Sequence, residues 1–167
     1  MTVWFARVGT PLAPRENALI ADWLRIVSPR APVAVTAIAS WREAEEFSRV
    51  PEHDSTWWNQ EEEERERLWE RAAELWSESE LLQRLDATTR GLEREIRAAA
   101  LAASVVAGVT HEKAAIEACE MALLAAHHSA LAELAGEQAG HRFVLKYALF
   151  AGGRWPLGYH SARFVIF

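Results

Sequence analysis

The segment LLQRLDATTRGLEREIRAAALAASVVAGVTHEKAAIEACEMALLAAHHSALAELA, residues 81–135, decides the fold of this chain. Its first half carries apolar or small residues at alternating steps of three and four, the spacing of a helix that packs along a seam. These positions are Leu81, Leu85, Thr88, Leu92, Ile96, Ala99, Ala103 and Val106. Gly108 ends this helix and Thr110 caps the next, which runs to about Ala135. So short a connection predicts two antiparallel neighbours.

The second helix of this pair is expected to turn one face inward. The residues expected on that face are Ile116, Cys119, Leu123, Ala126, Ala130 and Leu134. A third long helix is expected to precede the pair, from about Thr56, with the carboxylates of Glu61–Glu64 near its positive N-terminal end. Its apolar face comprises Leu68, Trp69, Ala72, Leu75 and Trp76. The S-x-x-E pattern of Ser77–Glu80 predicts a break before the next helix.

The first 50 residues predict a strand, a helix and a second strand. Thr2–Val8 is β-branched and aromatic, Arg15–Val27 has helical apolar spacing, and Pro32–Ala39 alternates apolar β-branched residues. This order suggests a right-handed crossover between two parallel strands. Ser40 and Glu43 form another S-x-x-E pair, which predicts a short helix after the second strand.

The C-terminal segment predicts a hairpin after one ambiguous element. In residues 141–150 the aromatic spacing suits a helix, whereas Val144 and Leu145 would suit a strand; we favour the helix. Trp155–Leu157 and Ala162–Phe167 are expected to form the hairpin. Because the last four residues are bulky and apolar, we expect them to be paired, most economically beside the N-terminal strand.

The fold class is therefore expected to be helix-rich α+β. An antiparallel bundle of long helices, about 56–135, should pack on a small mixed sheet made from N-terminal strands and a C-terminal hairpin. With 167 residues, half of them hydrophobic and a quarter charged, we expect a single domain over 1–167.

The net charge and the distribution of charged residues indicate which kinds of partner to expect. The net charge of −6 disfavours nucleic acid and anionic membranes as partners. The acidic run Glu61–Glu64 and the basic segment from His141 onward could attract each other or face different partners. The single cysteine and the lack of a secretory signal pattern predict a cytoplasmic protein, and the composition hints at a bacterial source.

Few residues suggest reaction chemistry. Glu120 and His127 lie two turns apart on one helix face, which makes them candidates for metal ligands. His128 is the alternative to His127, and Glu117 could add a carboxylate. Because no E-x-x-H motif is present, we expect no metal site, and no cofactor motif appears. Glu137 with His141 is a candidate acid–base pair, but Gly136 and Gly140 argue against one continuous helix, so we favour a loop salt bridge or no interaction. Cys119 is expected to be a buried, unreactive thiol.

Aromatic residues suggest binding more than catalysis. The chain holds eight tryptophans, and Trp57 and Trp58 are adjacent, so that one of them is expected to be exposed. The segment from Arg154 to His160 combines aromatic faces and cations, as binding hot spots do. The candidate ligand- or partner-binding residues are Trp57, Trp58, Tyr147, Arg154, Trp155, Tyr159 and His160.

Two functions agree with these features. The first is a non-catalytic interaction protein, inhibitor-, immunity- or adaptor-like, that binds a protein partner or itself, with a homodimer as one form; burial of all eight tryptophans would exclude it. The alternative is a small-molecule-binding protein or small enzyme with a pocket between sheet and bundle. Tyr147, Trp155, Tyr159 and His160 would line one side of that pocket and Trp4, Trp23 or Trp41 the other. His127 or His160 would be the catalytic base.

Overall fold

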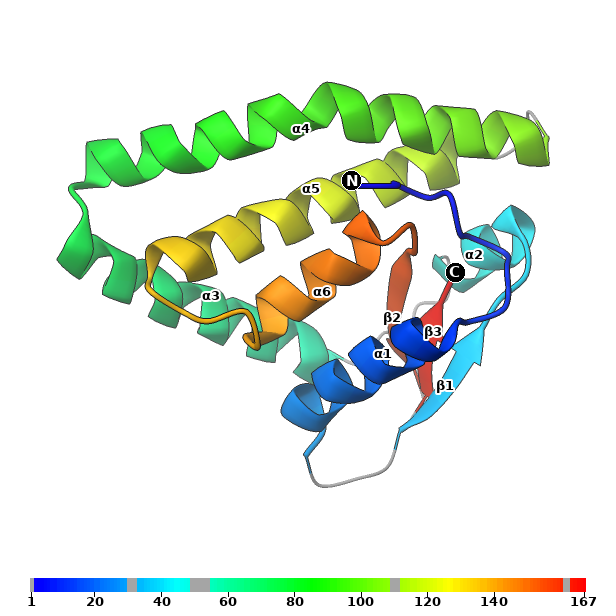
Figure 1. Ribbon diagram of the computed structural model, residues 1–167, viewed down its shortest axis with the longest axis horizontal. Coiled ribbons are helices and arrows are strands. Elements are labelled where there is room, and N and C mark those ends of the chain that lie inside the picture. The colour runs from blue at the N-terminus through cyan, green and yellow to red at the C-terminus, as the bar shows by residue number, and fades with distance from the viewer. Residues whose placement is uncertain (1, 30–32, 49–54, 109–111, 161–162) are drawn as a thin grey trace.

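The fold is helix-rich α+β with a small mixed sheet, as the sequence predicts (Figure 1). The computed structural model describes residues 2–29, 33–48, 55–108, 112–160 and 163–167. Within these residues the helices are α1 (Pro14–Val27), α2 (Trp41–Ser48), α3 (Ser55–Leu75), α4 (Glu78–Ala107), α5 (Glu112–Leu134) and α6 (Arg142–Ala151). The strands are β1 (Ala34–Ala37), β2 (Pro156–His160) and β3 (Arg163–Ile166).

Side-chain caps set where several helices begin. Ser77 Oγ accepts a hydrogen bond from the Glu80 backbone N–H at 3.4 Å, and Glu80 accepts from the Ser77 backbone N–H at 3.2 Å. At α2, Ser40 Oγ accepts a hydrogen bond from the Glu43 backbone N–H at 3.3 Å, whereas the Glu43 carboxylate accepts one from the Ala39 backbone N–H at 3.2 Å. Both predicted S-x-x-E starts are therefore confirmed, and the ambiguous segment forms helix α6, with His141 as its N-cap, and not a strand.

The helices are stacked so that α5 lies inside the molecule. α4 runs antiparallel to α5 along its whole outer side, and α3 and α6 cover α5 from the other side (Figure 1). Because neighbours cover it on several sides, α5 buries a broad face and leaves a narrower face, with Ile116 and Glu120, exposed. The buried residues are Ala114, Ala115, Ala118, Cys119, Ala122, Ala125, Ala126, His128, Ser129, Leu131 and Ala132. The predicted single inward face was wrong in part, since Ile116 is 46% exposed.

The predicted apolar faces of α4 and α3 each include a residue that is exposed near the C-terminal end of the helix. On α4, Leu81, Leu85 and Ile96 are buried, but Val106 is 90% exposed. On α3, Leu68 and Ala72 are buried, whereas Leu75 is 60% exposed. Helical spacing identifies a face correctly, but it does not tell how far along the helix a neighbour continues to cover that face.

The N-terminal segment is not a strand, which corrects the prediction for Thr2–Val8. Residues 4–9 form turns, and Phe5 has φ +54°, a left-handed conformation incompatible with a strand. The backbone N–H groups of Val3 and Arg7 donate to the carbonyl oxygens of Ala151 and Gly153 at 3.0 and 3.1 Å. The buried rings of Trp4 and Phe5 therefore anchor a turn against the end of α6, and their aromatic character reflects burial, not strand formation.

The sheet has the order β1–β3–β2, with β3 parallel to β1 and antiparallel to β2. The C-terminal hairpin is confirmed, but its last strand lies beside β1 and not beside residues 2–8. The parallel pair thus joins strands far apart in sequence, and the predicted crossover between two N-terminal strands is wrong. α1 packs on the sheet through Ile20, Trp23 and Leu24, which cluster with Phe164 and Ile166.

Candidate functional site

A cavity of about 420 Å³ lies between the C-terminal hairpin and the helices. α1, α2, α3, α5, α6 and both hairpin strands contribute side chains to its wall, so it is a product of the tertiary structure. Cavities of this size commonly hold small organic molecules. Its aromatic lining comprises Trp23, Trp58, Trp155, Tyr159 and Phe164, and its charged lining comprises Glu61, Glu117 and Lys146.

Lys146 and Glu61 form a buried ion pair in the cavity wall. Lys146 Nζ on α6 donates to both carboxylate oxygens of Glu61 on α3, at 2.7 and 2.9 Å. Only 8% of the Lys146 side chain and 3% of the Glu61 side chain are exposed. Charge-assisted hydrogen bonds are strong where water is excluded. The pair therefore joins α6 to α3 and presents a fixed polar group in a largely apolar wall.

Most of the aromatic wall is held rigidly. The ring centroids of Trp23 and Phe164 lie 4.8 Å apart, and those of Trp155 and Trp41 lie 5.9 Å apart. All four side chains are buried, so packing on their far sides fixes their positions. Trp58 differs, because it is 52% exposed while it lines the same cavity. It therefore lies at the cavity rim.

Glu117 is the third charged residue of the wall. It lies on α5, one turn before Met121, which also lines the cavity, and its side chain is half-buried. Within the part of the chain that the structure describes, no hydrogen bond or ion pair engages the Glu117 carboxylate. It is thus available to a molecule in the cavity.

His128 lies deeper, between α5 and α6. Its ring stacks on Phe143 with a centroid distance of 4.5 Å, and among the described residues its Nε2 has no hydrogen-bond partner. Burial lowers the pKa of His128 to about 4, more than the nearby Glu61 carboxylate raises it. The imidazole is therefore neutral at neutral pH and acts as a core residue outside the cavity lining.

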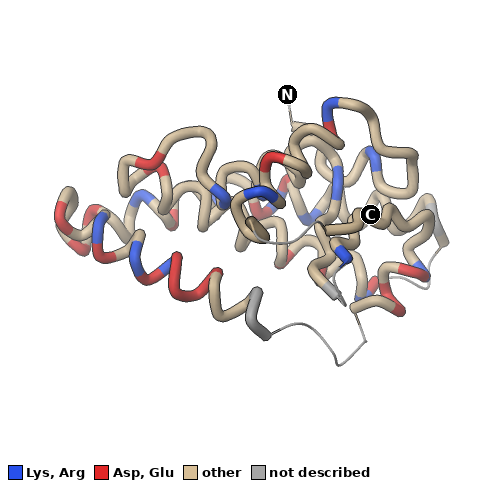
Figure 2. Tube along the Cα trace, turned by 90° about the horizontal axis from the view of Figure 1, so that it is seen from below, with Lys and Arg blue, Asp and Glu red and all other residues tan. Residues whose placement is uncertain are grey.

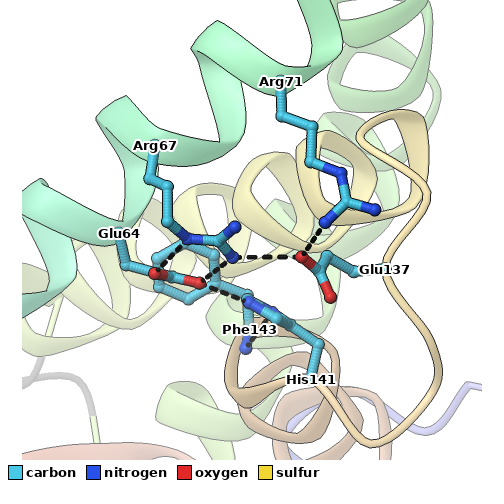
Figure 3. Close-up of polar contacts among 6 residues, drawn as sticks. All are labelled: Glu64, Arg67, Arg71, Glu137, His141 and Phe143. Atoms are coloured by element: carbon cyan, nitrogen blue, oxygen red, sulfur yellow. Dashed lines mark hydrogen bonds and ion pairs between the residues drawn. The ribbon is translucent and has the colours of Figure 1, made fainter.

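His141 belongs to a second polar cluster, where α6 begins beside α3 (Figure 3). His141 Nδ1 accepts a hydrogen bond from the Phe143 backbone N–H at 3.2 Å, which places the proton on Nε2. That Nε2 lies 2.6 Å from Glu64 Oε1. Both ring nitrogens are therefore engaged in capping α6 and docking it to α3.

Glu137 takes part in the same cluster through arginines of α3. Arg67 and Arg71 donate to Glu137 Oε1 at 3.0 and 3.2 Å (Figure 3). Hydrogen bonds from Arg67 and then His141 lower the pKa of Glu64 to about 2. Among the described residues no bond joins Glu137 to His141, so the candidate acid–base pair does not form. Glu137 lies in the loop before α6 and instead forms ion pairs with two arginines of α3.

The structure brings some predicted site residues together and separates others. Trp58, Trp155 and Tyr159 line the cavity, together with Trp23. Tyr147 does not line it; its ring lies 5.9 Å from that of Trp4. Trp4 and Trp41 line a second, more open hollow beside α4. The side chains of Trp57 and His160 lie outside the described part of the structure.

Arg154 proves to be an interior residue, and not part of a binding surface. It is 1% exposed, donates to both carboxylate oxygens of Glu16 at 3.0 and 2.9 Å, and donates to the carbonyl oxygens of Thr10 and Pro11. Trp155 beside it is also buried. The first part of the segment that the sequence suggested as a hot spot is thus packed inside the protein, whereas residues 157–159 are half-buried.

The candidate metal and thiol residues are dispersed. Glu120 is exposed on α5 and His127 is half-buried, with its pKa lowered by burial. Among the residues described, no group of three or more His, Cys, Asp or Glu side chains is placed to hold a metal ion. Cys119 is buried, and burial raises the pKa of its thiol, which agrees with the expected unreactive cysteine.

Comparison of the chain with protein-family models, curated proteins and solved structures gives no match. None of the helices in the described ranges has the length and apolarity needed to cross a bilayer. The site must therefore be interpreted from its own geometry.

Sequence reasoning missed Glu61 and Lys146 as cavity residues and considered Glu117 only as an additional metal ligand. Glu61 is one of four consecutive glutamates, and only one of them reaches the interior. Lys146 gave a usable signal, because it is the only charged residue between Phe143 and Phe150 in an otherwise apolar helix. The sequence left open whether the acidic run and the basic C-terminal segment attract each other or face different partners. Contacts of Glu61 with Lys146 and of Glu64 with His141 join the two segments.

Proposed function

We propose that this protein binds a small organic molecule in the cavity between the hairpin and the helices. The observation that carries the proposal is a cavity of about 420 Å³ whose aromatic wall contains a buried Lys146–Glu61 pair. A planar, mainly apolar body would pack between the aromatic side chains, and a polar group would meet the ion pair or Glu117. Mostly apolar walls with few polar groups are the usual composition of ligand sites.

A fluorescence titration with N-phenyl-1-naphthylamine, a neutral apolar dye built from two planar ring systems, tests this proposal. Emission should rise on binding to the parent protein. Met121→Trp, which fills the cavity, should weaken binding at least about tenfold. Leu82→Trp, at an exposed position of α4, is the matched control and should bind as the parent does. No binding by the parent, or equal binding by the Met121→Trp variant, would contradict the proposal.

We infer a second candidate function, association with a protein partner or with a second copy, from the outer end of α4. Leu101, Val105 and Val106 are 40%, 66% and 90% exposed there. Exposed apolar groups of this kind are favoured at protein interfaces. Sedimentation velocity of the parent and of a Val106→Glu variant tests self-association: the parent should sediment as a dimer and the variant as a monomer.

A further inference from the structure

The charges of the cavity wall do not cancel. Of the three charged residues that line it, Lys146 and Glu61 neutralise each other through two hydrogen bonds. Glu117 has no counter-ion among the described residues, so the described part of the wall carries one net negative charge. The whole chain has a net charge of −6, which adds a field of the same sign.

The aromatic lining favours a positively charged ligand, as the negative charge of the wall does. Three tryptophans, one tyrosine and one phenylalanine contribute to the wall. An aromatic ring attracts a cation to its face through its quadrupole, and tryptophan does so most strongly. Desolvation strengthens this attraction, and Trp23, Trp155 and Phe164 are almost wholly buried.

An anionic ligand fits the wall poorly. The single lysine there is already paired with Glu61 at 2.7 Å. If Lys146 turned to an anion, it would leave the Glu61 carboxylate buried without that partner, beside a ligand of the same sign. Glu117 would add a second repulsion. The wall thus disfavours anions for two reasons. Its negative charge repels them, and the lysine that could bind them is already paired with Glu61.

We propose that the cavity selects a small organic cation, a substituted ammonium group with apolar substituents, with Glu117 as its counter-ion and Trp58 at the rim. This inference rests on the proposed small-molecule function and specifies the chemical class of the ligand. A methylated ammonium group suits such a site better than a bare amine, because it is less strongly hydrated and offers more apolar surface to the rings.

Calorimetric titration with choline and with its neutral isostere 3,3-dimethylbutan-1-ol tests the selection. The parent should bind choline at least about tenfold more tightly than the alcohol. Glu117→Gln should reduce this ratio to below about threefold, because it removes the charge and keeps the shape. Glu120→Gln, on the exposed face of the same helix, is the control and should leave the ratio unchanged.

The outcomes separate this inference from the function on which it rests. Equal or tighter binding of the alcohol, or an unchanged ratio in the Glu117→Gln variant, would overturn the cation selection. If choline fails to bind while N-phenyl-1-naphthylamine binds, the selection also falls, but the small-molecule site stands. If neither choline, the alcohol nor the dye binds, both proposals fall.

Discussion

At the scale of single residues, the Lys146–Glu61 pair ties the stability of the protein to its candidate site. Both side chains are buried, and together they join α6 to α3 in the cavity wall. A buried pair gains little over a well-packed apolar pair, but loss of one partner leaves an uncompensated charge. Replacing only one of the two residues should therefore destabilise the protein more than replacing both.

We predict that Lys146→Met lowers the free energy of unfolding by about 3–5 kcal/mol, because Glu61 remains buried without its counter-ion. The double variant Lys146→Met, Glu61→Leu should regain most of this loss. Urea unfolding of the parent, both single variants and the double variant measures the coupling. Single variants as stable as the parent would show that the two side chains do not pair.

His128 gives a pH-dependent prediction. Burial lowers its pKa from 6.5 to about 4, so in this interval the unfolded chain binds a proton that the folded protein excludes. The stability contributed by His128 is complete above pH 6.5 and is lost as the pH falls toward 4. The loss is at most about 3 kcal/mol.

Urea unfolding at pH 7 and pH 4.5 measures this dependence. The parent should lose more stability between the two values than a His128→Leu variant does. His127→Gln, which alters the neighbouring half-buried histidine, should keep most of the parent's pH dependence. A parent and His128→Leu variant with the same dependence would contradict a buried neutral His128.

The residue scale also explains why the site was only partly predictable. Sequence patterns single out aromatic residues, and Trp58, Trp155 and Tyr159 do line the cavity. Arg154 belongs to the same aromatic and basic segment and was a binding candidate for that reason. It is nevertheless buried against Glu16 and two backbone carbonyl groups. The chemistry of an arginine is equally suited to a surface and to an internal anchor, so its role depends on contacts across 138 residues of sequence.

At the scale of elements, local signals predicted helices better than strands. Helix starts depend on capping residues three positions apart, as at Ser77 and Glu80, and such signals are local. The segment TVWFARV has the composition of a strand, but strand formation requires a partner edge. β3 takes the place beside β1, and residues 2–8 pack instead as a turn against Ala151 and Gly153.

Gly153 provides a test of this turn. Its φ is +99°, and a Cβ atom there would lie 2.9 Å from the Val3 carbonyl oxygen. We predict that Gly153→Ala destabilises the protein by about 1–3 kcal/mol, because the backbone is strained and the N-terminal turn must move. Thermal unfolding measures the change.

Gly91→Ala is a control substitution that we expect to stabilise the protein, in contrast to Gly153→Ala. Gly91 lies within α4, and no atom would come within 4 Å of an added Cβ. Gly91→Ala should stabilise the protein by about 0.5–1 kcal/mol, because alanine has the higher helix propensity. Destabilisation by both substitutions to the same extent would contradict the specific packing described for Gly153.

At the scale of the whole molecule, the arrangement follows from α5. Its small residues let α4 approach closely on one side and α3 and α6 on the other (Figure 1). Charged residues of both signs alternate along α3, the helix that follows the thin grey trace in Figure 2, and some of them pair with α6 and with the loop before it. Sequence spacing gave the antiparallel pair, but the central position of α5 depends on contacts with several distant elements.

The cavity is a property of the same scale, since five helices and two strands contribute to it. No local sequence pattern encodes the cavity. Sequence analysis therefore suggested a pocket between sheet and bundle but did not identify the charged residues that line it. The tryptophans report on it directly: Trp23, Trp58 and Trp155 line the cavity, whereas Trp69 and Trp76 belong to the separate core cluster of α3, α4 and α5.

The most direct test of the small-molecule site is therefore a ¹H–¹⁵N spectrum of the tryptophan indole N–H groups, recorded with and without N-phenyl-1-naphthylamine. The account predicts shifts for Trp23, Trp58 and Trp155, and unchanged signals for Trp69 and Trp76. Shifts confined to Trp69 and Trp76, or no shift of any indole signal at saturating dye, would contradict it.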